Sequence, residues 1–227
     1  MTDILIEGGR ALLGEEFLET SVRTAGCDIG AVGTGHERST FAIDARDLLV
    51  LPGIVDLHGD AFERQMMPRP GVDFPIDVAL ADSDRQAIAN GITTVFHATT
   101  WSWEPGLRSG DNARRLLDAI ETLRPALSAD TRFHLRHETY NLDAESEIGQ
   151  WLSEGRIDLL AFNDHMDSTI ASLAKPLKRS RMVERTGLSD KAFDELAQRV
   201  LSRADAVPAS IARLCETARA SGVRMLS

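Results

Sequence analysis

Short hydrophobic runs separated by glycines fill the first fifty residues of the chain. Runs of this length between glycines are typical of strands joined by tight turns. We predict a small β domain over residues 1–52, in which His36 is a solvated loop histidine. The apolar runs lie at residues 4–6, 11–13, 17–22, 29–32 and 41–43, and the turns at Gly8-Gly9, Gly26 and Gly33-Thr34-Gly35.

After Pro52-Gly53 the pattern changes to strands that alternate with helices. This alternation favours a parallel sheet with right-handed crossovers, so we predict an α/β fold over residues 53–227. Residues 62–75 and 99–110 are expected to be loops, and Asn112 is the expected N-cap of the helix that follows it. The expected strands are 54–57, 93–98, 132–138, 157–163 and 223–227, and the expected helices are 77–90, 113–123, 145–154, 189–202 and 209–220.

The length of the second region limits its architecture. The 175 residues after Pro52 (227 less 52) are too few for a complete (β/α)8 barrel, which takes about 250 residues. Five strands cannot close such a barrel at its usual tilt and shear. We therefore predict the first part of a TIM-like barrel, C-terminally truncated. Because an open sheet exposes unpaired strand edges, a poorly soluble fragment without activity of its own is one hypothesis.

Composition narrows the classes of partner. The chain has 227 residues, of which 43% are hydrophobic and 26% charged, as in ordinary soluble domains. Its net charge of −10 argues against nucleic acid or an anionic membrane as the main partner. Cys27 and Cys215 are too few for a disulfide framework. The first residues, MTDILIEGG, read as neither a signal peptide nor a spanning helix, and we expect a cytoplasmic location.

Candidate chemistry begins in the stretch LPGIVDLHGDAFE, residues 51–63. His58 and Asp60 end its apolar run and alternate along the strand, so both side chains should leave one face. An imidazole and a carboxylate placed in this way suit a divalent metal. A capping histidine followed by a turn aspartate would give the same short pattern.

The histidines lie on or just after the predicted strands. Barrel enzymes place their chemistry at the carboxyl ends of strands, so the set favours a shared, metal-centred site. Any single member could instead be a core or loop histidine. His134 precedes the polar end of its strand by several residues, and we expect a structural role for it. The set comprises His58, His97, His134, His137 and His165.

These motifs resemble a known family. Pro52, Gly53, Asp56 and His58 match the start of the barrel in the amidohydrolase superfamily, although Asp60 stands where that superfamily usually has histidine. The resemblance is most specific to one branch, the α-D-ribose 1-methylphosphonate 5-triphosphate diphosphatases of phosphonate breakdown. It implies that residues 1–52 form half of a β-sandwich beside the barrel. The segments that carry it are FERQMMPRPGVDFP, TTVFHATTWSWEPGLRS, FHLRHETYNLD and AFNDHMD.

The resemblance also implies roles for individual residues. It implies a divalent metal, with zinc as the expected ion, in one or two copies. Its ligands would be His58, Asp60, Glu138 as a bridging carboxylate, and His165, with Asp60 and Glu138 also catalytic. Asp164 and His137 are alternatives because each lies one strand step away. Family members supply further ligands from strands beyond Ser227.

A phosphorylated substrate requires cations. Arginine binds phosphate through a two-pronged fork, which favours arginines over single lysines. The run of residues 175–181, KPLKRSR, is either a phosphate clamp or a solvated loop. The expected substrate-binding residues are Arg64, Arg69, His97, Arg108 and Arg136.

Three functions remain open at this stage. The resemblance implies a hydrolase that cleaves the triphosphate of a small polyphosphorylated sugar to the 5-phosphate and pyrophosphate, through metal-bound hydroxide. A second possibility is hydrolysis of a cyclic amide C–N bond, as elsewhere in the superfamily. The third is the inactive fragment. The sequence leaves homo-oligomer formation open.

Overall fold

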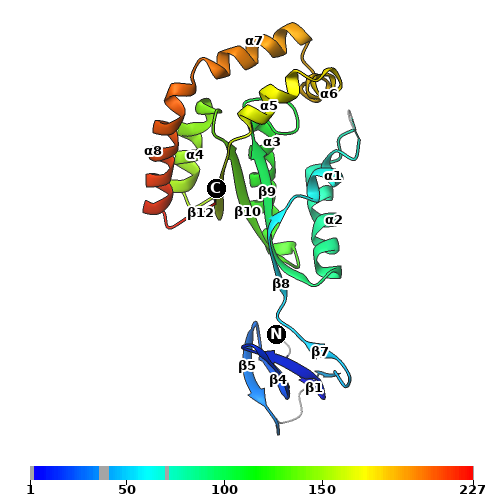
Figure 1. Cartoon of the computed structure of the whole chain (residues 1–227). Coiled ribbons are helices and arrows are strands. Elements are labelled where there is room, and N and C mark those ends of the chain that lie inside the picture. The colour runs from blue at the N-terminus through cyan, green and yellow to red at the C-terminus, as the bar shows by residue number, and fades with distance from the viewer. Residues whose placement is uncertain (1–2, 36–40, 70–71, 227) are drawn as a thin grey trace. The chain divides into compact units, whose positions relative to one another are not determined.

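The computed structural model describes residues 3–35, 41–69 and 72–226, so the predicted loop histidine His36 lies outside the described residues. The chain divides after Gly53 into two compact units, Met1–Gly53 and Ile54–Ser227 (Figure 1). Each unit has its own sheets.

The first unit consists of short strands in two sheets. The predicted run 17–22 covers two of these strands, with Thr20 between them. Gly8 and Gly26 adopt φ values of 81° and 64°, which glycine reaches without steric cost at tight turns. One sheet has the order β5-β4-β1-β6, from β1 Ile4–Glu7, β4 Ser21–Ala25, β5 Asp28–Gly33 and β6 Phe41–Asp44, and the other has the order β3-β2-β7, from β2 Arg10–Leu13, β3 Glu16–Glu19 and β7 Leu49–Val50.

The second unit is built on a parallel sheet of five strands in the order β12-β11-β10-β9-β8. All four pairings are parallel. The predicted strands are confirmed, but β9 runs three residues further than expected, so the loop after it begins at Ser102. The strands are β8 Ile54–Gly59, β9 Ile92–Trp101, β10 Asp130–Glu138, β11 Leu159–Asn163 and β12 Arg224–Leu226.

Helices connect and cover these strands. The loop expected over residues 62–75 contains a short helix, and residues 176–181 of the cationic run are helical, which excludes the solvated loop that was one of its two interpretations. A further helix, α5, directly follows the polar end of β11. The helices are α1 Phe62–Met66, α2 Ile76–Ala89, α3 Gly110–Leu123, α4 Glu145–Ser153, α5 Met166–Leu173, α6 Pro176–Thr186, α7 Asp190–Leu201 and α8 Val207–Ala220, with single 3-10 turns at Arg124–Ala126, Leu142–Ala144 and Ala204–Ala206.

The N-cap of α3 also differs from the expectation. Ser109 is the capping residue, and its Oγ accepts a hydrogen bond from the backbone N–H of Asn112 at 3.4 Å. Asn112 lies in the first turn, where its side chain donates to the Leu107 carbonyl at 3.0 Å. Serine and asparagine are both good caps, so sequence preference alone did not distinguish them.

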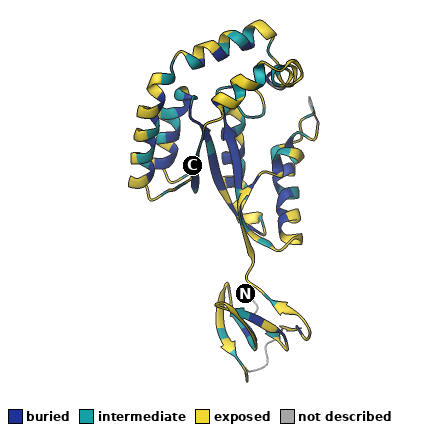
Figure 2. Ribbon diagram, viewed as in Figure 1, coloured by how far each residue is buried: buried dark blue, intermediate teal, exposed yellow. Residues whose placement is uncertain are grey.

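The central strand β10 has two faces of different character. Phe133 and Leu135 belong to the core that the sheet forms with the helices, together with Trp151 of α4. Successive strand residues point to opposite faces, so His134, Arg136 and Glu138 share the other face, here called the inner face. Figure 2 shows buried residues along the strands and on the sheet-facing sides of the helices.

Asp84 ties α2 to the start of β10. Its carboxylate is 6% exposed and accepts hydrogen bonds from the backbone N–H groups of Ser128, at 3.0 Å, and Ala129, at 2.8 Å. Ala129 is buried, so water could not replace the Asp84 carboxylate as the acceptor for its N–H group.

We predict that Asp84→Ala lowers the free energy of unfolding by about 1–3 kcal/mol, the cost of leaving a buried donor unpaired. Asp84→Asn keeps one acceptor oxygen and should lose less. Urea unfolding of the three proteins at pH 7 checks this order. Equal stability of the alanine and asparagine variants would contradict it.

Two buried histidines make the second unit sensitive to acid. His97 and His137 are 3% and 0% exposed, and burial lowers the pKa of each to about 4. An unfolded histidine titrates near 6.5, so the unfolded chain binds more protons below that pH. The contribution of these two neutral histidines to the free energy of unfolding is therefore fully present above about pH 6.5, and it is lost as the pH falls toward 4.

We predict that His137→Phe reduces this loss. Phenylalanine takes up no proton and can keep the edge-to-face contact with Phe162, whose ring centroid lies 6.2 Å away. The measurement is the unfolding free energy at pH 7 and pH 5 for both proteins. An unchanged difference between the two pH values would show that His137 does not contribute.

Candidate active site

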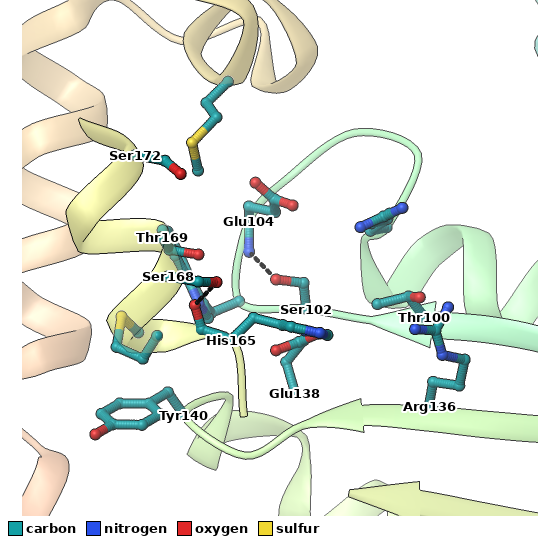
Figure 3. Close-up of a pocket in the computed structure, with 14 residues that line it drawn as sticks. Thr100, Ser102, Glu104, Arg136, Glu138, Tyr140, His165, Ser168, Thr169 and Ser172 are labelled. Atoms are coloured by element: carbon teal, nitrogen blue, oxygen red, sulfur yellow. Dashed lines mark hydrogen bonds and ion pairs between the residues drawn. The ribbon is translucent and has the colours of Figure 1, made fainter. Parts of the chain in front are cut away.

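A pocket of about 310 Å³ lies at the carboxyl ends of β9, β10 and β11 (Figure 3). This is the edge where barrel enzymes carry their chemistry. The strand β10 contributes Arg136 and Glu138, and the start of α5 adds small hydroxyl side chains. The loop after β9 contributes Ser102, Glu104 and Arg108.

Glu138 and His165 meet in this pocket. Glu138 is the last residue of β10 and pairs in register with Asn163 of β11, so His165 follows two residues later at the same edge. His165 Nδ1 lies 2.7 Å from Glu138 Oε1. The carboxylate side chain is 11% exposed and the imidazole 55%, so the pair is anchored on one side and open to solvent on the other. The structure thus brings together two of the four predicted metal ligands.

The two alternative ligands have other roles in the structure. Asp164 Oδ1 accepts a hydrogen bond from the backbone N–H of Met166 at 3.2 Å, at the start of α5. His137 points to the helix-facing side, where it packs on Phe162. Of each neighbouring pair, Glu138 and His165 are therefore the residues whose side chains meet in the pocket.

Two arginines give the pocket positive charge. Arg136 is half-buried and lies two residues before Glu138 on the same face, where its side chain makes no hydrogen bond or ion pair within the described residues. Arg108 approaches Glu63 of α1 at 4.0 Å, the limit of an ion pair. Guanidinium groups without a close counter-ion are ready partners for a phosphate or carboxylate.

The loop after β9 is fixed to the end of β10. The Ser102 N–H donates to the Arg108 carbonyl at 2.8 Å, which closes the loop, and the Asn141 side chain donates to the Ser102 carbonyl at 3.2 Å. Sequence reasoning missed Ser102, Glu104 and Asn141. Their position just after a predicted strand end is the sequence signal that could have identified them as pocket residues.

His58 and Asp60 lie apart from this pocket. Gly59 pairs with His97, which pairs with Phe133, so the end of β8 is level with the middle of β10. The His58 ring meets the His134 ring there, with centroids 5.7 Å apart. His134 precedes Glu138 by four residues, which is about 13 Å along a strand.

The predicted ligand set is therefore divided between two places. Within residues 3–35, 41–69 and 72–226, no three His, Cys, Asp or Glu side chains gather closely enough to hold a metal ion. His134, expected to be structural, has a pKa lowered to about 4, chiefly by burial.

The remaining predicted substrate-binding residues lie elsewhere. Arg64 is exposed and lines a separate cavity beside α2, and Arg69 is exposed in a bridge with Val72. His97 lines a cavity of about 150 Å³ on the helix-facing side and packs on Phe62. The structure does not bring these three residues to the pocket of Glu138.

The cationic run 175–181 is not part of the pocket's anion-binding charge either. It lies at the start of α6, and Arg179 forms ion pairs with Asp194, at 2.7 Å, and Asp190, at 3.1 Å, both on α7. Arg179 therefore holds two helices together.

Comparison with known proteins supports this architecture. The chain is 27% identical over 168 residues to the alpha-D-ribose 1-methylphosphonate 5-triphosphate diphosphatase of Escherichia coli (strain K12), a match that covers 71% of this chain and 44% of that protein. The chain resembles this diphosphatase in sequence. The resemblance that the motifs indicated is therefore confirmed. No family model matches the chain.

Solved structures share the fold. A D-hydantoinase aligns over 98% of this chain and 51% of its own, at 18% identity and a TM-score of 0.52. The D-hydantoinase of Bacillus sp. AR9 aligns over the same shares of both chains at 18% identity and a TM-score of 0.49. The alignment with the TM-score of 0.52 confirms the partial barrel with a small β domain as the fold. The chain spans about half the length of these proteins.

The described helices carry no segment that is long and apolar enough to cross a membrane.

We predict that Arg136→Gln weakens binding of inorganic pyrophosphate by about tenfold to a hundredfold, the range expected for losing a charged hydrogen bond. Arg64→Gln is the matched control, because Arg64 lines a different cavity. Isothermal titration calorimetry measures both. Equal weakening by the two changes would show that pyrophosphate responds to overall charge alone.

Proposed function

We propose that the chain is the catalytic-site half of a hydrolase of the amidohydrolase type that cleaves α-D-ribose 1-methylphosphonate 5-triphosphate to the 5-phosphate and pyrophosphate. The observation that carries the proposal is the Glu138–His165 pair, which lies in one pocket with two arginines. The sequence likeness to the E. coli diphosphatase supports the substrate.

The Glu138–His165 pair fixes the tautomer of the imidazole. An ionised carboxylate only accepts hydrogen bonds, so Nδ1 of His165 carries the proton and Nε2 keeps its lone pair. That lone pair can accept a proton from water or bind a cation. Glu138 orients the ring and stabilises a positive charge that develops on it.

The arginines handle the charge of a polyphosphate. The whole chain carries −10, so an anionic substrate must be attracted locally. Arg136 lies between the inner-face positions of His134 and Glu138, with steps of about 6.6 Å along the strand. An extended phosphate chain that follows β10 would meet Arg136 and Arg108 before it reaches Glu138. These groups can neutralise the leaving pyrophosphate.

A divalent metal fits part of the site. Glu138 and His165 are donors of the right chemistry at one edge of the sheet, whereas His58 and Asp60 do not join them in this arrangement. When bound, a zinc ion would act as a Lewis acid and lower the pKa of water. Binding of the substrate anion and orientation of the imidazole fall to Arg136, Arg108 and Glu138 themselves.

Hydrolysis of a cyclic amide is the second candidate. The fold shared with a D-hydantoinase over 98% of this chain favours it. Such a substrate carries no polyphosphate, so it gives the two arginines no comparable role. Arginine variants therefore discriminate between the two reactions.

We predict that the protein releases pyrophosphate from the ribose triphosphate and that Glu138→Gln lowers the rate at least about a hundredfold, as expected when the carboxylate that orients a proton-accepting imidazole is lost. Arg64→Gln should retain the rate. A coupled pyrophosphate assay, run beside a hydantoin ring-opening assay, provides the measurement. Ring opening without pyrophosphate release would favour the cyclic amide, and absence of both activities would favour the inactive-fragment hypothesis.

A further inference from the structure

The hydrogen-bond ladder between β8 and β9 is interrupted next to His58. Regular pairing holds at Val55 and Asp56, shifts between Asp56 and Gly59, and resumes at Gly59. Leu57 and His58 therefore have no cross-strand partners in the register. Strand β8 is also the last strand in the order of its sheet, so within the described residues no strand pairs on its other side.

Two side chains replace the missing ladder. The His58 N–H donates to Asp56 Oδ1 at 2.9 Å, and the Leu57 carbonyl lies 2.9 Å from His134 Nδ1. This carbonyl and this N–H belong to one peptide group. A carbonyl oxygen only accepts, so Nδ1 of His134 must carry the proton. The peptide between Leu57 and His58 is thus held at both ends by side chains.

His134 also supports the imidazole of His58 directly. The two rings meet edge to face, with centroids 5.7 Å apart and an interplanar angle of 82°. His134 reaches across from β10 because its in-register partner on β9 is Ala98, whose methyl group leaves room. Both Ala98 and His134 are fully buried, whereas His58 is exposed.

This contrast between support and exposure is informative. A buried imidazole that leaves Nε2 without a partner costs free energy, and an apolar side chain would fill the same space more cheaply. An exposed surface histidine needs no such support. Buried polar groups thus hold one exposed ring in place.

We infer that Asp56 and His134 are positioning residues that clamp the Leu57–His58 peptide and so aim the His58 imidazole into the inner face. The inference goes beyond the proposed function, whose pocket does not include His58. His134 therefore acts through His58, and Asp56 acts together with it on the same peptide group.

Paired variants test the inference. The amide nitrogen of asparagine occupies the place of histidine Nδ1, and that of glutamine occupies the place of Nε2. His134→Asn therefore keeps the donor to the Leu57 carbonyl, and His134→Gln removes it. In the same way, Asp56→Asn keeps an acceptor for the His58 N–H, and Asp56→Ala removes it. Circular dichroism confirms that each variant is folded.

The first readout is nuclear magnetic resonance of the metal-free protein. In His134→Gln the His58 ring signals should shift and broaden, and in His134→Asn they should stay close to wild type. In Asp56→Ala the His58 amide hydrogen should exchange at least about tenfold faster, because its hydrogen bond to the Asp56 carboxylate is lost, and Asp56→Asn should preserve its protection.

The second readout is zinc titration followed at the His58 ring. The glutamine and alanine variants should bind zinc there about 10- to 100-fold more weakly than wild type, the range seen when an orienting partner of a metal-binding histidine is lost. The asparagine variants should stay near wild type.

The outcomes separate this inference from the proposed function. Unchanged His58 signals and exchange in His134→Gln and Asp56→Ala would overturn the inference. If wild-type His58 does not respond to zinc but its signals still depend on His134, the positioning role stands and zinc binding at His58 is ruled out, which leaves the Glu138–His165 pocket of the proposed function untouched. If His134→Gln does not fold, the Asp56 pair decides.

Discussion

The alternation of side chains along β10 is the constraint on which the second unit depends. Odd positions from Phe133 to His137 face the helices, and even positions from His134 to Glu138 face inward. Because the strand lies between β9 and β11 in register, this alternation sorts one strand into a core face and a chemical face. A shift by one residue would bury Arg136 and Glu138 among apolar side chains.

The same constraint explains why the pocket lies at one edge. Parallel strands end together, so the loops that follow β9, β10 and β11 converge there. Backbone bonds then refine the position of each group. Asn141 fixes the loop after β9, and the turn before α5 presents His165 to Glu138. The side chains that carry charge are therefore placed by rigid strands and short, bonded loops.

Much of the fold was predictable because its signals are local. A glycine shortly before the strand marks β8, β9, β11 and β12, whereas β10 has none nearby. The Glu138–His165 pair follows from two neighbouring strand ends. The helix α6 was missed because its sequence, PLKRSRMVERT, is dominated by polar residues, so its helical pattern is weak. Partners inside the fold, such as the Asp194 that Arg179 finds on α7, are not visible in a local run.

The separation of His58 from Glu138 was not visible in the sequence for a different reason. His58 and Glu138 stand on strands that are not neighbours, and their relative height depends on two registers and an interruption of the ladder in β8. No local sequence pattern encodes the combined effect of these registers on the relative height of the two residues. We expected a structural role for His134, but the sequence did not indicate its partner. That partner is the Leu57 carbonyl, which lies 77 residues away in the chain.

The loose contact between Arg108 and Glu63 would link the proposed binding of an anion thermodynamically to the position of α1. At 4.0 Å the carboxylate holds the guanidinium weakly, so an arriving anion competes for the same cation. Drawing Arg108 away would break its contact with Glu63, so the cost of breaking that contact would be subtracted from the binding free energy of the anion. Reciprocity then requires that a shift of α1 alters the affinity for the anion by the same factor.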